Sequence, residues 1–318
     1  MNYWTRPKPD HMTDEVVKKL PDWLKSFCVK SRVEKLCVSF LGGEPSIRMD
    51  LCLNLMESIY SKLNEVVRPY HGSWFMFFTN GDFLTDEALI EMSRYNTIVL
   101  YNPTYDSLEE IDRKLKLIKK RIRFCCMSVV IDSVNIGRLI EIADIALSNK
   151  VNLRLNPLYH PTSDYIHSLY EPLDSLFDHL ISTDELIWPK LLLGSLYVGW
   201  GSRSISPYSY GSWLLVVDTD GSIRICSADD GTDIGDLSTI SSIDDVKFDH
   251  SWNAKSIGLC QRCEWLSWCH GGHPLTRFSY YGSYNYPTPY CDLYKKLFPK
   301  WKSLLDKWES RKHGQMYM

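Results

Sequence analysis

Five short apolar runs alternate with amphipathic segments through the first half of the chain. The runs are candidate buried strands and cover residues 36–40, 75–81, 97–102, 124–131 and 151–159. The segments between them carry apolar residues at helical spacing and cover 13–28, 49–66, 86–95, 107–120 and 135–150, with Pro21 interrupting the first. Strands that alternate with helices predict a parallel sheet joined by right-handed crossovers. The fold class predicted from this pattern is therefore α/β.

The second half of the chain has a different pattern. From about 160 to 210 the periodicity loosens, and Pro, Ser, Gly and Tyr become frequent around 201–212. We place the domain boundary there, which gives a first domain over 1–200 and a second over 201–318. Residues 213–226 are predicted to form a β-hairpin, because Asp220-Gly221 is a strong turn signal. A Lys-rich amphipathic helix is predicted over 292–311.

Charge and hydropathy exclude several classes of protein. Among 318 residues, 36 Lys and Arg face 39 Asp and Glu, so the net charge is −3, which disfavours sequence-independent binding of nucleic acid. No stretch approaches the roughly 18 apolar residues that cross a bilayer. The opening residues contain no apolar signal core. We therefore expect a cytoplasmic protein with neither nucleic acid nor a membrane as partner.

Four of the ten cysteines fall into a pattern typical of metal sites. They follow the order C-x2-C-x5-C and then a lone Cys, at Cys260, Cys263, Cys269 and Cys291. Tight clusters of thiols in a reducing compartment indicate metal binding before disulfides. Four thiolates suit a [4Fe–4S] cluster or a structural zinc ion. A second plausible set of zinc ligands consists of Cys260, Cys263, Cys269 and His273. The spacing alone therefore does not decide between iron and zinc.

Two polar loops follow neighbouring predicted strands. Gly42-Gly43-Glu44-Pro45 comes directly after the first strand, and Thr79-Asn80-Gly81 closes the second. Asn102 lies at the end of the third. Ligands bind beyond the carboxyl ends of parallel strands, and paired glycines let a ligand approach the backbone closely. Each loop could equally be a simple turn, and turn capping is the more economical role for Asn80.

These motifs together resemble those of the radical S-adenosylmethionine (SAM) enzymes that carry a C-terminal SPASM domain. LGGEP after one strand, FTNG after the next and the Cys-rich tail occur in the same order and span nearly the whole chain. The resemblance implies a partial (β/α) barrel, here missing its first strand, followed by a small Cys-rich SPASM-like domain. It also implies an enzyme that modifies a peptide or protein substrate with SAM and iron–sulfur clusters.

The resemblance assigns roles to particular residues. It implies that SAM is bound at the first two loops, by Gly42, Gly43, Glu44, Pro45 and Asn80. It implies one auxiliary [4Fe–4S] cluster on Cys260, Cys263, Cys269 and Cys291. Cys226 and His273 stand where a second auxiliary cluster has ligands, but this possible second site is incomplete because no cysteine precedes Cys226 at the required spacing.

One defining motif of that family does not occur in the sequence. No C-x3-C-x2-C is found, so the three thiolates that hold the SAM-binding cluster are missing. One interpretation is an active enzyme represented without its N-terminal part, which is the interpretation we favour. The alternative is a non-catalytic iron–sulfur (or zinc) protein that binds a peptide for a modification system. In either case we expect no reductive cleavage of SAM by these 318 residues.

Overall fold

The computed structural model describes residues 11–70, 72–103, 105–183, 215–224, 233–246 and 257–315, with side chains up to 311. The chain forms two compact units. The first comprises residues 1–78, 82–98 and 208–250, and the second comprises 79–81, 99–207 and 251–318. Each unit is described in turn.

The central sheet confirms the α/β prediction. Its five strands are β2 (Val38–Phe40), β4 (Phe75–Thr79), β5 (Ile98–Tyr101), β6 (Phe124–Val130) and β7 (Asn152–Asn156), in the order β2-β4-β5-β6-β7. β2 and β4 pair in parallel with Phe40 opposite Phe77, and β6 and β7 pair in parallel with Val130 opposite Asn156. Five consecutive residues of β6 are buried, as is typical of a strand covered on both faces.

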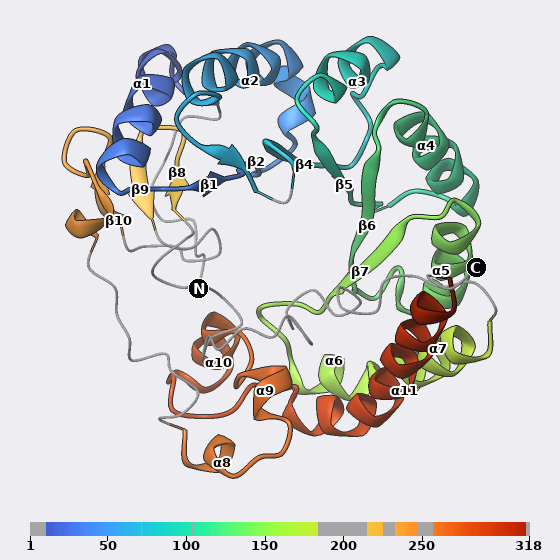
Figure 1. Cartoon of the computed structure of the whole chain (residues 1–318). Helices are drawn as coiled ribbons and strands as arrows, with labels where there is room; N and C mark the ends of the chain where they lie inside the picture. Colours follow the sequence, from blue (N-terminus) through green and yellow to red (C-terminus); the bar gives the residue numbers. More distant parts are fainter. Residues whose placement is uncertain are drawn as a thin grey trace. The chain divides into compact units, whose positions relative to one another are not determined.

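In the first unit, helices cover one side of short strands (Figure 1). These helices are α1 (Asp14–Lys30), η1 (Pro45–Arg48), α2 (Met49–Leu63) and α3 (Asp86–Ser93). β1 (Lys35–Leu36) pairs in parallel with β3 (Arg68–Pro69). The core places Met56 and Ile59 of α2 and Leu89 of α3 together with Phe75 and Phe77 of β4, all fully buried. The remaining strands are β8 (Val216–Val217), β9 (Ser222–Arg224) and β10 (Asp233–Asp236), with η4 (Ile243–Asp245) after them.

In the second unit, two helices pack on the outer side of strands β5, β6 and β7 of the central sheet. They are α4 (Leu108–Arg121) and α5 (Leu139–Ser148), the latter preceded by η2 (Ile136–Arg138). Ile111, Leu115 and Ile118 recur at helical spacing on α4 and are buried, so the apolar stripe faces the strands. Ser107 caps α4, because its side chain accepts a hydrogen bond from the Glu110 amide at 3.2 Å.

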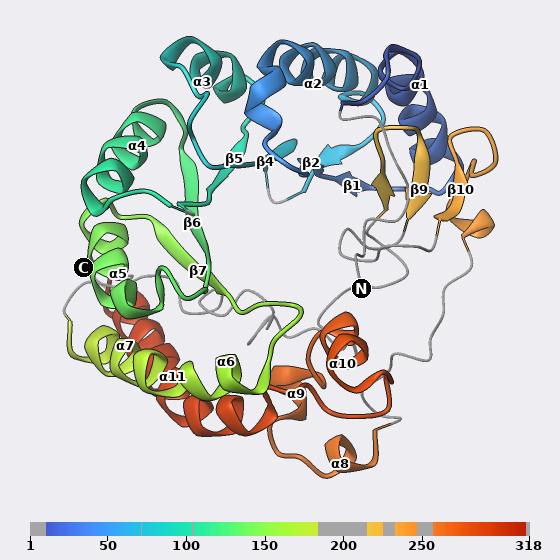
Figure 2. The same cartoon turned by 180° about the vertical axis from the view of Figure 1, so that it is seen from behind.

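The Cys-rich region belongs to the same unit and is built from short helices. They are α8 (Gly258–Gln261), α9 (Leu266–Cys269) and α10 (Pro274–Tyr281), followed by the long α11 (Cys291–Gln315). α11 lies alongside α7 (Tyr170–Ser182) in both views (Figure 2). Trp301 of α11 is fully buried, and its ring lies 6.3 Å from Phe177 of α7 and 6.1 Å from Trp268 of α9.

The structure corrects two predictions about local structure. α1 runs unbroken through Pro21, which is buried inside the helix, so this proline does not interrupt it. Residues 160–182, which the sequence suggested were loosely structured, contain α6 (Ser163–Ser168) and α7. A buried stripe of Leu173, Leu176, Phe177 and Leu180 gives α7 its packing face.

Other predictions fall partly outside the described residues. β8 and β9 form the predicted antiparallel hairpin, and Gly221 in its turn has φ +84°. The domain boundary near residue 200 lies in a segment outside the described ranges and stays a prediction. No helix in the described part of the chain combines the length and apolar character that a membrane crossing requires.

Candidate functional site

The Gly42-Gly43 loop connects β2 to η1 and leaves space beside its backbone. Gly42 has φ +132°, a conformation that residues with a side chain rarely adopt. A Cβ atom added at Gly42 or Gly43 would meet no atom within 4 Å. Glycine at these two positions is therefore not required by packing within the protein, and the open backbone can accept a ligand at close range.

Internal hydrogen bonds set the remainder of this loop. The Glu44 carboxylate accepts hydrogen bonds from the Ser46 amide at 3.1 Å and from the Ser46 hydroxyl, and so caps η1. The Cys52 thiol of α2 donates to the Pro45 carbonyl at 3.4 Å. Burial raises the pKa of Cys52 to about 12, so this thiol stays a neutral donor. The loop is thus anchored on its Glu44-Pro45 side and open on its Gly42-Gly43 side.

The second predicted loop, Thr79-Asn80-Gly81, belongs to the second unit. The Gly81 backbone N–H donates to Thr79 Oγ1 at 2.9 Å, and the Asn102 backbone N–H donates to the Thr79 carbonyl at 2.7 Å. Asn102 Oδ1 is buried and accepts no hydrogen bond from any residue that the structure describes. A buried amide oxygen without a donor is costly unless a ligand or water supplies one. This atom is the strongest local indication of a binding site at these strand ends.

Sequence reasoning missed the charged group that supports this loop. Lys114 of α4 is buried, and its Nζ lies 3.0 Å from both carboxylate oxygens of Asp106 and 3.1 Å from the Asn80 carbonyl. A signal for it does exist in the sequence. Lys114 lies three residues after Ile111 and four before Ile118, so it occupies the apolar face of an otherwise regular amphipathic helix.

The four predicted cysteine ligands all lie in the second unit, on or beside α8, α9 and α11. Cys260 and Cys269 are buried, and Cys263 and Cys291 are partly exposed. The Cys263 amide donates to the Cys260 carbonyl at 3.1 Å, which closes the turn of the C-x2-C pair. Gly272 brings the two halves of the set together, since a Cβ there would lie 2.3 Å from Thr288 Cβ, three residues before Cys291.

The four thiols interact electrostatically. The pKa of Cys269 is raised to about 12, chiefly by burial and to a smaller extent by the thiols of Cys291, Cys260 and Cys263, while a hydrogen bond from the Gly271 amide lowers it. The pKa of Lys295 is raised chiefly by Cys291, and also by Cys263 and Cys260. Cys263 and Lys295 also line one hollow, so this cation lies beside the set.

The four cysteines are nevertheless not arranged around a single metal-ion position. Within the described ranges, no group of three or more His, Cys, Asp or Glu side chains is arranged to hold a metal ion. A zinc ion needs all its thiolates at about 2.3 Å from a single centre, whereas a [4Fe–4S] cluster takes each thiolate on its own iron. In donor chemistry, the four thiols suit either a [4Fe–4S] cluster or a zinc ion.

His273 is buried and caps a helix. Its Nδ1 accepts a hydrogen bond from the Leu275 amide at 3.1 Å, at the start of α10, and its ring meets Tyr159 edge-on at 4.5 Å. Burial lowers its pKa to about 3, so the ring is neutral and carries its proton on Nε2. Metal binding by His273 would require this arrangement to change. Its proposed co-ligand Cys226 lies outside the described residues, so the second site stays a prediction.

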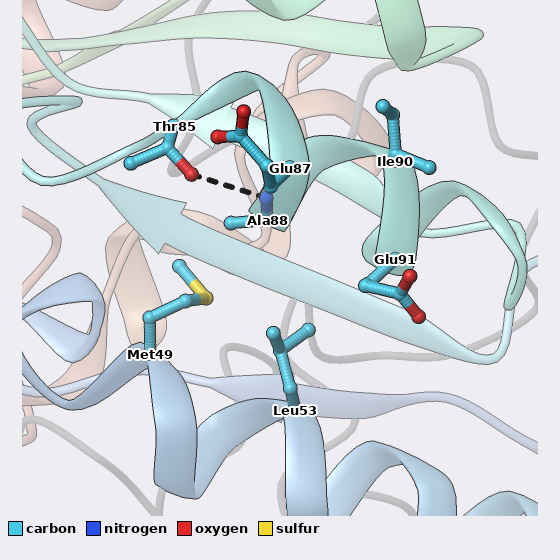
Figure 3. A pocket seen from close by; sticks show the side chains of 7 residues that line it. All are labelled: Met49, Leu53, Thr85, Glu87, Ala88, Ile90 and Glu91. Atoms are coloured by element: carbon cyan, nitrogen blue, oxygen red, sulfur yellow. Dashed lines mark hydrogen bonds between the residues drawn. The ribbon is translucent and has the colours of Figure 1, made fainter.

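The described surface is hollowed in more than one place. A groove of about 390 Å³ between α2 and α3 has Met49 and Leu53 on one side and Glu87 and Glu91 on the other (Figure 3). None of the predicted site residues lines it. A second hollow of about 500 Å³ includes Cys263 in its lining, together with Leu259, Arg262, Glu264, Trp265, Lys295 and Pro299. One edge of the cysteine set is therefore open to solvent.

Comparison with known proteins identifies the fold. No protein-family model and no curated protein matches the chain. Native anSMEcpe with bound AdoMet, an anaerobic sulfatase-maturating radical SAM enzyme, matches with a TM-score of 0.70 at 17% identity, covering 96% of this chain and 95% of that one. With AdoMet and the Cp18Cys peptide, it matches with a TM-score of 0.64 at 18% identity, covering 93% and 91%.

A second enzyme shows the same likeness. Streptococcus suis SuiB bound to its precursor peptide SuiA matches with a TM-score of 0.57 at 16% identity, covering 90% of this chain and 70% of SuiB. At such low identities, the shared feature is the fold. This chain therefore has the α/β architecture, with a parallel sheet, of these structures.

Proposed function

We propose that this chain is a radical SAM/SPASM-type protein that binds SAM, carries one auxiliary [4Fe–4S] cluster and acts on a peptide or protein. The observation that carries the proposal is a likeness along nearly the whole chain to an enzyme solved with AdoMet. The same enzyme, and SuiB, are also solved with peptides, which supports a peptide as the partner.

The residues present fit SAM at two places. The open backbone at Gly42 and Gly43 is suited to the amino and carboxylate end of the ligand, and Glu44 and Pro45 hold the loop in shape. In the second unit, the buried Asn102 Oδ1 offers an acceptor to a hydroxyl or amine, and Asn80 lies on the neighbouring loop. SAM supplies radical chemistry when a cluster reduces it, while the protein binds and orients the substrate.

The cysteine set fits an auxiliary cluster. Cys260, Cys263, Cys269 and Cys291 supply four thiolates, which satisfies every iron of a [4Fe–4S] cluster. Lys295, four residues after Cys291 on α11, places a positive charge beside the anionic set. The described residues of this chain thus support one cluster in the Cys-rich region.

The alternative function is a non-catalytic iron–sulfur or zinc protein that binds a peptide for a modification system. One sequence observation favours it, since C-x3-C-x2-C is absent from these 318 residues. Without three thiolates at that spacing, these 318 residues hold no cluster where SAM would be reduced.

The same absence limits the leading proposal. We therefore propose that the chain as given binds SAM without cleaving it.

Equilibrium dialysis of the anaerobically purified chain against SAM tests this proposal, followed by incubation with dithionite. We expect saturable binding of SAM and no 5′-deoxyadenosine. Production of 5′-deoxyadenosine would show that the proposed inactivity is wrong. A cluster-loaded chain that binds no SAM would overturn the proposed SAM site and favour the peptide-binding alternative.

A further inference from the structure

Lys114 and Asp106 form an ion pair deep in the second unit. The exposed fraction of the side chain is 4% for Lys114 and 17% for Asp106. The Asp106 carboxylate also accepts a hydrogen bond from the Tyr101 hydroxyl at 2.6 Å, and the Asp106 carbonyl accepts one from Arg138 at 3.2 Å. Buried lysines occur in proteins almost only when they are paired, as this one is.

A buried ion pair is a poor source of stability. The cost of removing both charges from water largely offsets their attraction, and apolar residues of similar size often stabilise a fold as well or better. An apolar residue at position 114 would also continue the buried stripe of Ile111, Leu115 and Ile118. The pair is therefore better explained by what its ammonium group holds than by the free energy of folding.

The ammonium holds the loop that follows β4. It donates to the Asn80 carbonyl at 3.1 Å, and the stem of Lys114 lies beneath Gly81. A Cβ at Gly81 would come within 3.2 Å of Lys114 Cδ and 3.3 Å of the Tyr101 ring, and Gly81 has φ +80°. The Gly81 backbone is therefore closely packed against the side chains of Lys114 and Tyr101.

We propose that Lys114 is a positioning residue for the ligand site of the second unit. By holding the Asn80 carbonyl, its ammonium fixes the backbone that carries the Asn80 side chain. The next strand end supplies Asn102, whose backbone N–H donates to the Thr79 carbonyl and whose buried Oδ1 has no donor among the described residues. The inference rests on the proposed function, in which SAM is the ligand at these strand ends. Lys114 acts through Asn80 and does not itself touch the ligand.

A double-mutant cycle separates positioning from general support of the fold. The first change is Lys114→Met with Asp106→Asn, which removes both charges together and avoids an uncompensated buried carboxylate. The second change is Asn80→Ala. The dissociation constant for SAM is measured by equilibrium dialysis for the parent, each variant and their combination. Lys116→Met is the matched control, because Lys116 lies on the exposed face of the same helix.

We expect the charge-removing change to weaken SAM binding about tenfold in the parent and less than about twofold once Asn80 is alanine, because residues that act together are not additive. Lys116→Met should leave binding unchanged. An equal loss in both backgrounds would overturn the proposal, since Lys114 would then act independently of Asn80.

If the parent binds no SAM, the effect of Lys114 on the loop can still be measured by amide hydrogen exchange. The Gly81 and Asn102 amides, which donate to Thr79, should exchange faster in the charge-removing variant than in Lys116→Met. Unchanged exchange would overturn the positioning role itself. Faster exchange in a chain that binds no SAM would keep the support of the loop and refute the proposed SAM site, and with it the role of Lys114 toward a ligand.

Discussion

Gly42 and Gly43 are neighbours with equal space around them and different backbones. Neither has an atom within 4 Å of the position of a Cβ, but only Gly42 lies in the left-handed region, at φ +132°. The pair therefore allows the strain of the backbone to be measured apart from steric clash.

The Gly42→Ala variant should lower the free energy of unfolding by about 1–3 kcal/mol, the usual cost of a strained backbone. The Gly43→Ala variant should stay within about 0.5 kcal/mol of the parent, as substitutions in open space do. Urea unfolding followed by tryptophan fluorescence gives both values. Equal effects of the two substitutions would mean that the Gly42 conformation carries no strain.

At the same scale, the sequence indicated some residues of the candidate site and not others. Gly42, Gly43 and Asn80 are predicted as site residues because polar and glycine residues directly follow apolar runs, and these assignments stay predictions. Lys114 was missed because charged residues on a Lys-rich helix are usually solvated, and its partner Asp106 lies before the helix. Only the packed structure shows that this lysine turns inward to Asp106 and Asn80.

Among the elements, α11 packs the Cys-rich region against α7 of the second unit. Cys291 begins it, and Trp301 lies three turns on, packed against Phe177 of α7, Trp268 of α9 and Phe298 of α11 itself. Aromatic side chains bury large areas, so Trp301 joins α7, α9 and α11 at one point.

Replacing Trp301 with alanine should therefore lower the free energy of unfolding by about 3–5 kcal/mol, as for other buried tryptophans. Thermal or urea unfolding of the variant measures this loss. Lys302→Ala is the control, because the Lys302 side chain is exposed and forms only a surface ion pair with Asp306, 3.0 Å away, within the described part of α11. A loss below about 1 kcal/mol would contradict the central packing role of Trp301.

The sequence predicted most strands and helices of the sheet region because their periodicities are strong. It failed at α7, whose apolar residues are separated by Asp, Ser and His and preceded by a Pro- and Tyr-rich stretch. It also overestimated the effect of Pro21, which removes one backbone donor from α1 while the helix stays packed through Val16, Leu20 and Phe27. Tertiary packing decided both cases.

At the scale of the whole molecule, the order of LGGEP, FTNG and the Cys-rich tail correctly predicted the α/β fold of the solved structures. The likeness to anSMEcpe covers 96% of the chain at only 17% identity, so the architecture is retained where most of the sequence differs. What the sequence could not supply is the metal, because the same thiols suit an iron–sulfur cluster or a zinc ion.

The most direct test of the account is iron and zinc analysis of the anaerobically purified chain, with its visible spectrum. We predict about four irons per chain and broad visible absorption, as for one [4Fe–4S] cluster. The Cys291→Ser variant should lose this iron, and Cys28→Ala, at a buried thiol in α1, should keep it. A colourless protein with about one zinc ion per chain would contradict the account.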